Sequence, residues 1–279
     1  MGINTGAAEA SFSLNKLSWD EHVDHHVASD FYDVEGFRAG RDILGPIEGS
    51  GIGDVDGRRV LHLQCHFGLD SLSLARRGGI VTGLDFSSKA IAAARQLARE
   101  TGVDANFVEG NVYDAPALLS PGEWDIVFTT WGTVTWLPDI ARWADVVAQM
   151  LRPGGRLYFL DAHPVTSALQ QAEPGAPIQP TYDYFHGSVP LEFEEDGSYA
   201  DAQSSFTHTR SHEWIHPLSA ILTGLIEAGM RIDVVREHDA IAWQLFPSMS
   251  RGEDGLWRLP VGVPRIPLAV TVEAEKLIC

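Results

Sequence analysis

An aspartate and the turn upstream of it carry the clearest chemical signal in the sequence. Asp85 closes a series made of an apolar run, a turn, an amphipathic stretch and a second apolar run (59–63, 64–68, 69–77 and 80–84). A strand, turn, helix and second strand that ends in an acid form the nucleoside-binding half of a doubly wound sheet. The carboxylate would accept hydrogen bonds from two adjacent ribose hydroxyls, although an acid there would also favour the dipole of a following helix.

The turn indicates which nucleoside is bound. A dinucleotide fold needs glycines at the first turn positions, because backbone amides must approach a pyrophosphate. Gln64 and His66 stand at those positions, and only Gly68 remains. Their side chains would crowd a diphosphate, whereas a ligand with a ribose and no phosphate tolerates them. We therefore expect S-adenosylmethionine (SAM), although the alternative is that these residues simply form a tight strand-to-helix turn.

Residues at the ends of the neighbouring strands extend this predicted site. Parallel strands end at one edge of a sheet, and ligands of open α/β sheets bind beside that edge. For the group that follows the predicted strand 106–108, an ordinary Asx turn is the alternative. The further candidates for cofactor contact are Phe86, Ser87, Asn111, Val112, Tyr113 and Thr129.

These residues resemble the motifs of the class I SAM-dependent methyltransferases. The segment 62–68, His-Leu-Gln-Cys-His-Phe-Gly, is similar to that family's Asp-x-Gly-x-Gly-x-Gly motif, in a form that resembles a bacterial subfamily of small-molecule methyltransferases. Later motifs of the family resemble segments 83–87, 109–114, 124–128 and 151–157. The resemblance implies SAM as cofactor, with Asp85 on its ribose. His62, Gln64 and His66 replace an acid and two glycines, so the family's usual backbone grip on the methionine end is not implied.

The order of the predicted elements gives a Rossmann-like α/β fold. Alternating strands and helices force a mostly parallel sheet, flanked by helices, with right-handed crossovers. The resemblance implies seven strands, the last of them antiparallel. The predicted strands are 59–63, 80–84, 106–108, 126–129, 157–160, 231–235 and 268–272, and the main helices are 69–77, 87–100, 138–151 and 217–229.

We expect one domain over residues 1–279, because a chain of 279 residues can bury a single elaborated core. Residues 1–15 are small and polar and are expected to fray, and 45–57 read as a surface linker. The expected parts are an N-terminal lid of two short helices and a linker (17–50), a SAM-binding core (58–163), an inserted hairpin cap (165–216) and the remainder of the sheet (217–279).

The acceptor side of the site is defined by fewer signals. An acceptor that is an oxygen or an ammonium group needs a base, and an imidazole titrates near neutrality. The candidates for a base are His163, Tyr32 and His22, and those for the substrate pocket are Trp131, Tyr184 and His186. The alternatives are a core position for Trp131 and, for His163, a loop histidine bonded to backbone.

Two histidine groups raise the question of a metal, and we expect none. His212-Glu213-Trp214-Ile215-His216 matches the zinc-protease pattern His-Glu-x-x-His, which needs a helix. Pro217 and the alternation before the motif predict a strand, in which Glu213 points away from both histidines. His22, His25 and His26 would meet on a helix, without an evident fourth ligand type.

The composition restricts the partners. A net charge of −18 disfavours nucleic acid and anionic membranes, because phosphate contacts need clustered Lys and Arg. Cys65 and Cys279 are the two cysteines, which excludes a disulfide framework. Residues 1–15 lack the features of a signal peptide, and no run approaches the ~18 apolar residues of a membrane span. We expect a cytoplasmic monomer or homodimer that acts on a small molecule.

The function expected from these observations is transfer of the SAM methyl group to a small-molecule acceptor by in-line displacement. Three alternatives remain. The same site could hold SAM for an intramolecular displacement that releases methylthioadenosine, or the chain could bind SAM without turnover. A nicotinamide-dependent oxidoreductase is a different class, which Gln64 and His66 disfavour.

Overall fold

The architecture is taken from a computed structural model, which describes residues 5–200 and 204–278. Within these residues seven strands form one sheet in the order β10-β13-β5-β4-β1-β2-β3. Strands β1 to β5 run parallel, and β13 is antiparallel to both of its neighbours. The predicted Rossmann-like sheet is confirmed. Its strands are β1 (Arg59–Leu63), β2 (Ile80–Asp85), β3 (Asn106–Glu109), β4 (Trp124–Thr130), β5 (Leu151–Ala162), β10 (Met230–His238) and β13 (Ala269–Lys276).

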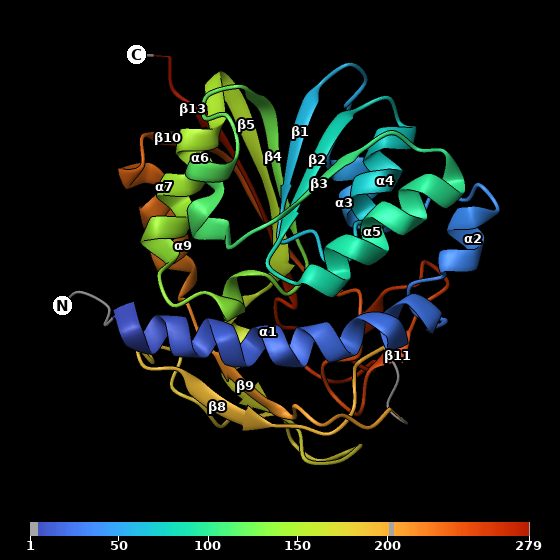
Figure 1. Cartoon of the computed structure of the whole chain (residues 1–279). Coiled ribbons are helices and arrows are strands. Elements are labelled where there is room, and N and C mark those ends of the chain that lie inside the picture. Colours follow the sequence, from blue (N-terminus) through green and yellow to red (C-terminus); the bar gives the residue numbers. More distant parts are fainter. Residues whose placement is uncertain (1–4, 201–203, 279) are drawn as a thin grey trace.

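Helices cover both faces of the sheet (Figure 1). On one face lie α6 (Ala115–Leu118), α7 (Ile140–Met150) and α9 (Leu218–Glu227), and on the other lie α3 (Pro46–Gly51), α4 (Leu69–Arg76) and α5 (Ser88–Thr101). The ends of α5 follow the sequence signals, because the Ser87 side chain accepts a hydrogen bond from the Ala90 N–H and Gly102 takes the left-handed conformation.

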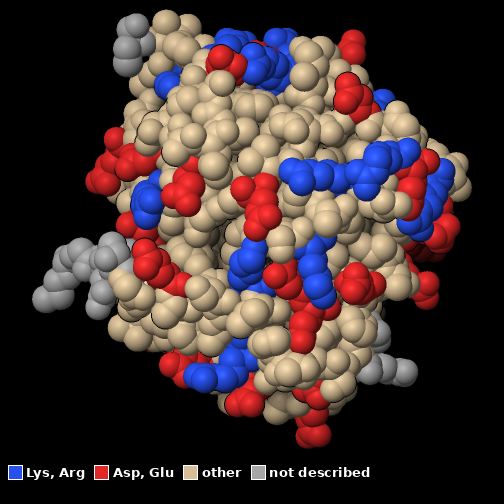
Figure 2. All heavy atoms as spheres, in the orientation of Figure 1, with Lys and Arg blue, Asp and Glu red and all other residues tan. Residues whose placement is uncertain are grey.

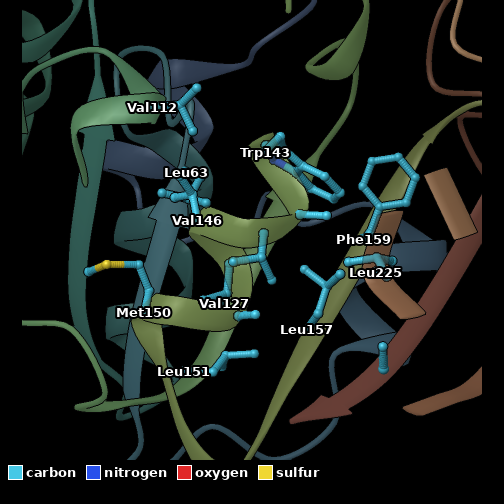
Figure 3. Packing of buried hydrophobic residues seen from close by; sticks show 14 of the residues in the cluster. Leu63, Val112, Val127, Trp143, Val146, Met150, Leu151, Leu157, Phe159 and Leu225 are labelled. Carbon is cyan, nitrogen blue, oxygen red and sulfur yellow. The ribbon is translucent and has the colours of Figure 1, made fainter. Parts of the chain in front are cut away.

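The apolar stripe of α7 packs on strands β4 and β5. Trp143 and Met150 of the helix are fully buried against Val127 and Leu157 of the strands, and the Trp143 ring lies 5.5 Å from that of Phe159 (Figure 3). Burial of one such side chain stabilises the fold by about 1.5–3 kcal/mol. This layer therefore fixes the two strands whose carboxyl ends reach the candidate site.

The N-terminal helix is longer than predicted. α1 (Thr5–Ala28) is continuous, whereas fraying was expected over 1–15 and two short helices after residue 17. The second of these helices is present as α2 (Val34–Arg38). The expectation of fraying is wrong for residues 6–15, where Ser11 and Asn15 are buried, and residues 1–4 lie outside the described ones. In Figure 1, α1 lies across one end of the sheet, between the sheet and strands β8 (Leu191–Glu194) and β9 (Arg210–Glu213).

The segment 45–57 was predicted to be a surface linker, and this prediction is also wrong. It contains α3, which begins at Pro46, and the side chains of Glu48, Ile52 and Val55 are buried. The Gly45 N–H donates to Glu48 Oε1 at 2.7 Å, which closes the first turn. A helix of six residues is too short to show a periodic pattern, so no periodicity in the sequence indicated it.

The predicted cap, residues 165–216, contains the expected hairpin. Strands β8 and β9 pair antiparallel, and His212 and Glu213 lie on β9, so their motif has the strand context expected from the alternation. A further antiparallel pair, β11 (Ser250–Arg251) and β12 (Trp257–Arg258), was not predicted. The remaining short elements are β6 (Leu169–Gln170), β7 (Gln179–Pro180), α8 (Pro164–Ser167), η1 (Val112–Asp114) and η2 (Val134–Trp136).

The described helices include none with the length and apolar character needed to cross a membrane. On the face drawn in Figure 2, Lys and Arg side chains are intermingled with Asp and Glu side chains.

Candidate cofactor and acceptor site

A cavity of about 760 Å³ lies at the carboxyl ends of the parallel strands. The turn 64–68 follows β1, Asp85 ends β2, and residues 110–112 follow β3. Thr130 at the end of β4 and Asp161 in β5 complete this side of the lining. All five parallel strands therefore contribute to one cavity, as expected for a ligand site in an open α/β sheet.

The turn after β1 has a left-handed backbone at three positions, of which only the last is a glycine. Gln64, His66 and Gly68 have φ angles of 57°, 50° and 74°. Left-handed backbone costs a residue with a side chain about 1–2 kcal/mol. Such strain clusters at functional sites. The turn thus presents two polar side chains, Gln64 and His66, to the cavity at positions where the Asp-x-Gly-x-Gly-x-Gly motif has glycines.

Asp85 is held by the same turn. Its Oδ2 accepts a hydrogen bond from the His66 N–H at 2.8 Å, and its Oδ1 accepts one from the Ser87 N–H at 2.9 Å. Burial raises the pKa of Asp85 to about 6, and the two backbone hydrogen bonds offset part of that rise. A carboxylate oxygen has about two lone-pair positions, so Asp85 can still accept from two ligand hydroxyls.

Ten of the sixteen predicted site residues line the cavity. The lining residues are His22, Tyr32, Gln64, His66, Gly68, Asp85, Phe86, Asn111, Val112 and Trp131. Three others lie behind this lining. Ser87 caps α5 and donates from Oγ to Asp20 Oδ1 at 2.5 Å, the Tyr113 hydroxyl donates to the Asp139 carbonyl at 2.8 Å, and Thr129 is buried in β4.

The positions of His163, Tyr184 and His186 correct the sequence prediction, because none of these residues lines the cavity. His163 turns away at the end of β5. Its Nδ1 accepts from the Val165 N–H at 3.2 Å, and its Nε2 lies 3.1 Å from Glu237 Oε1 on the other side. The Tyr184 hydroxyl accepts from the Leu218 N–H at 2.9 Å, which ties it to the start of α9.

Six carboxylates in the lining were not predicted as site residues: Glu48, Asp70, Asp161, Glu195, Glu213 and Asp254. Glu213 reaches the cavity from β9, and its Oε2 accepts from Thr135 Oγ1 at 3.2 Å. Burial raises the pKa of Glu213 to about 7. The alternation of β9 was visible in the sequence and places Glu213 on the face opposite His212, but which face meets the cavity depends on the tertiary structure.

The helix α1 connects the two sides of the cavity. On the sheet side, Lys16 Nζ donates to the Phe86 carbonyl and lies 3.0 Å from Glu109 Oε1. On the cap side, Asn15 Nδ2 donates to the His212 carbonyl at 2.8 Å, and Asn15 Oδ1 accepts from the His212 N–H at 2.8 Å. The side chain of Asn15 thus pairs with β9 as a neighbouring strand would.

Comparison with known proteins now identifies the family. A model of the methyltransferase domain family matches residues 60–155. The ubiquinone biosynthesis O-methyltransferase of Pectobacterium carotovorum is 31% identical over 174 residues, which cover 58% of this chain and 72% of that protein. The chain belongs to the class I SAM-dependent methyltransferases. The cofactor of this methyltransferase is therefore SAM, as the sequence predicted.

The length of the match differs from one relative to the next. The corresponding enzyme of Cronobacter sakazakii is 34% identical over 137 residues, and the match covers 48% of this methyltransferase and 56% of that protein. A solved SAM-dependent methyltransferase of Mesorhizobium loti covers 85% of this chain and 99% of its own, with 21% identity and a TM-score of 0.55, which shows a shared fold. The matched part of the chain thus spans little more than half of the length of the Cronobacter enzyme.

The charges in the lining fit the cofactor. SAM carries a sulfonium and an ammonium, whereas a dinucleotide carries a negative pyrophosphate. Among the described residues that line the cavity, the single Lys or Arg is Arg251. The carboxylates in the same lining are Glu48, Asp70, Asp85, Asp161, Glu195, Glu213 and Asp254. A cationic nucleoside is therefore favoured over a phosphorylated one.

Proposed function

We propose that this methyltransferase transfers the methyl group of SAM to a small-molecule acceptor. The observation that carries the proposal is the continuity of the cavity. The lining runs without division from Asp85 to aromatic side chains at the end of β4, in the cap and in the segment that follows β10: Trp131, Tyr182, Phe193 and Trp243. A volume of about 760 Å³ lies in the range of small-ligand sites, about 300–1,000 Å³.

Bound SAM supplies a methyl group that is already activated by the positive sulfur. The chain then has to hold the acceptor in line with that methyl group and exclude water. Correct orientation of two reactants accounts for up to about 7–11 kcal/mol of a barrier. We assign the orientation of the nucleoside to Asp85 and the exclusion of water to α1 and the cap, because these elements cover the cavity.

Proton removal from an oxygen acceptor needs a base beside the cavity. We propose Glu213 for this role, since its pKa of about 7 suits a base that operates near neutral pH. Tyr32 and His22 are the sequence candidates that also line the cavity. Burial raises the pKa of Tyr32 well above its ordinary value, which makes its phenol a poor base.

We further infer that the protein acts in the cytoplasm, because the buried Cys65 is a free thiol and suits a reducing compartment. Monomer and homodimer both remain predictions for its oligomeric state.

Calorimetry with SAM tests the cofactor half of the proposal. The Asp85→Ala variant is expected to bind SAM about 100-fold more weakly, because it loses hydrogen bonds to a charged acceptor. Asp145→Asn is the control of equal charge change: Asp145 is an exposed residue of α7 and does not line the cavity. Equal affinity of the wild type and Asp85→Ala, or preferential binding of NAD, would contradict the proposal.

Identification of the by-product tests the transfer half. The protein is incubated with SAM and a metabolite extract, and the adenosyl product is analysed by mass spectrometry. S-adenosylhomocysteine supports methyl transfer, and methylthioadenosine indicates attack on the methionine chain instead. Binding of SAM with no product would make the protein a non-catalytic SAM-binding protein.

A further inference from the structure

Two acidic side chains line the cavity on the side of helices α3 and α4. Glu48 comes from α3 and Asp70 from the first turn of α4, and both line the cavity. Glu48 is 5% exposed. Its Oε1 accepts from the Gly45 N–H, and its Oε2 makes no hydrogen bond of normal geometry to a described residue, although the Trp131 side chain lies beside this carboxylate. A buried carboxylate oxygen without a hydrogen bond is costly, so this oxygen is suited to accept one from a donor group of a ligand in the cavity.

Asp70 shows the same need for a positive partner. Thr130 Oγ1 donates to Asp70 Oδ2 at 3.3 Å, which is a long contact for the one hydrogen bond to this carboxylate. Burial, and then the charge of Glu48, raise the pKa of Asp70 to about 7. The two carboxylates repel each other, and a cation bound between them would relieve that repulsion.

The acid pair and Asp85 lie near the same turn. Cys65 lies in the middle of that turn, near Asp85 and Asp70. Burial and the charges of these two carboxylates all raise the pKa of its thiol. Asp85 is bonded to the backbone of the turn at His66, whereas Asp70 begins the helix that follows Gly68. A ligand that extends from Asp85 across the turn therefore reaches Glu48 and Asp70 with its other end.

The position that carries an acid in the resembling motif supplies no negative charge here, although Nε2 of the histidine that stands there lines the cavity without a partner among the described residues. It is His62, whose Nδ1 lies 2.8 Å from Ser71 Oγ, and burial lowers its pKa to about 3. A neutral imidazole replaces a negative charge at that point. The negative charge nearby is supplied instead by residues outside the motif.

We propose that Glu48 and Asp70 bind the α-ammonium group of the methionine part of SAM. The proposal rests on the proposed cofactor site at Asp85. A metal ion is the other cation that paired carboxylates attract, but the described residues contain no group of three or more His, Cys, Asp or Glu side chains arranged to hold one. A single ammonium needs fewer ligands, because its three N–H donors match the free oxygens of two carboxylates.

The test compares two ligands by calorimetry: S-adenosylhomocysteine, and its analogue in which hydrogen replaces the α-amino group. Wild-type protein is expected to bind the analogue about 10- to 100-fold more weakly, which is the range for a hydrogen bond to a charged group. In Glu48→Gln and Asp70→Asn this preference shrinks toward equal affinity, because the ammonium has lost its partner. Asp145→Asn, an exposed residue of α7, is the control of equal charge change and keeps the full preference.

The outcomes separate this inference from the proposed function. Binding of the parent ligand by the wild type, with the preference lost in both variants, supports the inference. If the wild type binds the parent ligand and both variants keep the preference, the inference is overturned while the cofactor site stands. If the wild type binds neither ligand, the cofactor site itself fails. Gln and Asn preserve the shape of the side chains that they replace, so both variants are expected to fold. Thermal unfolding of each variant verifies that the affinities are compared between folded proteins.

Discussion

The two walls of the cavity are built in different ways. The wall on the sheet is backbone geometry: the turn 64–68 and Asp85 are fixed by strand pairing and by hydrogen bonds between close neighbours in the fold. The wall under the cap is assembled from side chains of distant segments. His26 of α1 links the two walls, because its Nδ1 lies 2.9 Å from Nε2 of His66 in the turn and its Nε2 lies 2.7 Å from Oγ of Ser198 in the cap.

This difference separates the two parts of the proposed reaction. The sheet wall carries the contacts expected for the cofactor, and its parts cannot shift without disturbing the core. The cap wall carries Glu213 and the aromatic side chains expected around the acceptor, and it is joined to the rest largely through α1. A change in the cap wall should therefore alter turnover and leave the affinity for cofactor intact, and a change in the sheet wall should affect stability as well.

The largest effect is expected from the cap wall, with Glu213→Gln. If the acceptor gives up a proton to this carboxylate, the turnover rate falls by about 100-fold or more, the usual contribution of a general base. In the wild type the base must be deprotonated, so activity at saturating SAM rises as the pH increases through about 7, the pKa of Glu213. The variant lacks that rise.

The control for Glu213→Gln is Glu192→Gln. Glu192 lies on the adjacent strand β8, pairs with Arg210 at the surface and does not line the cavity, so its amide variant should keep both rate and pH profile. A loss of SAM affinity in Glu213→Gln would break the separation between the walls. An unchanged pH profile would remove Glu213 as the base.

The sheet wall was also the part that the sequence predicted best. Asp85 and Asn111 each follow an apolar run, and in a parallel sheet such positions must meet at one edge, whatever the rest of the chain does. Eight of the ten predicted residues that line the cavity do so for this reason, and the other two, His22 and Tyr32, come from the N-terminal helical segment. His163 does not line the cavity because β5 already ends at Ala162, and His163 turns with the chain that follows and caps α8.

The cap wall depends on contacts that no local pattern announces. Asn15 bonds to the backbone of a residue 197 positions away, so a polar stretch that appeared ready to fray is instead a packed helix. Glu48 lies in a segment that reads as a linker, and Trp243 lies in a loop without periodicity. Only the tertiary structure gives these side chains their place in the cavity.

The next effect in size is expected from the sheet wall, with Gly68→Ala. A Cβ on Gly68 would lie 2.4 Å from the Phe107 ring and 2.9 Å from Ala94 Cβ, and the residue has a φ of 74°. Crowding and left-handed backbone together should lower the free energy of unfolding by about 3 kcal/mol. Urea denaturation measures the loss.

Gly102→Ala is the matched control for that loss. Gly102 has a φ of 66°, but a Cβ there meets nothing within 4 Å, so only the backbone contribution of about 1 kcal/mol remains. Similar losses in the two variants would mean that the first turn tolerates added volume. That result would contradict the description of the sheet wall as rigid.

The smallest effect is expected from a pair of variants at His66, and it tests whether this wall is strained. His66→Gly and His66→Ala both remove the imidazole and its contact with His26, so their difference isolates the backbone at a φ of 50°. The glycine variant should be more stable than the alanine variant by about 1 kcal/mol. The opposite order is normal in a helix, and Ala92→Gly at an exposed position of α5 should show it, with a loss of about 1 kcal/mol. If alanine is the better residue at both places, the left-handed turn is not strained. We expect the His66 side chain to contact the cofactor because a side chain at this φ angle costs backbone strain, and such strain is kept at functional sites. Without that strain, this reason for expecting the contact would be lost.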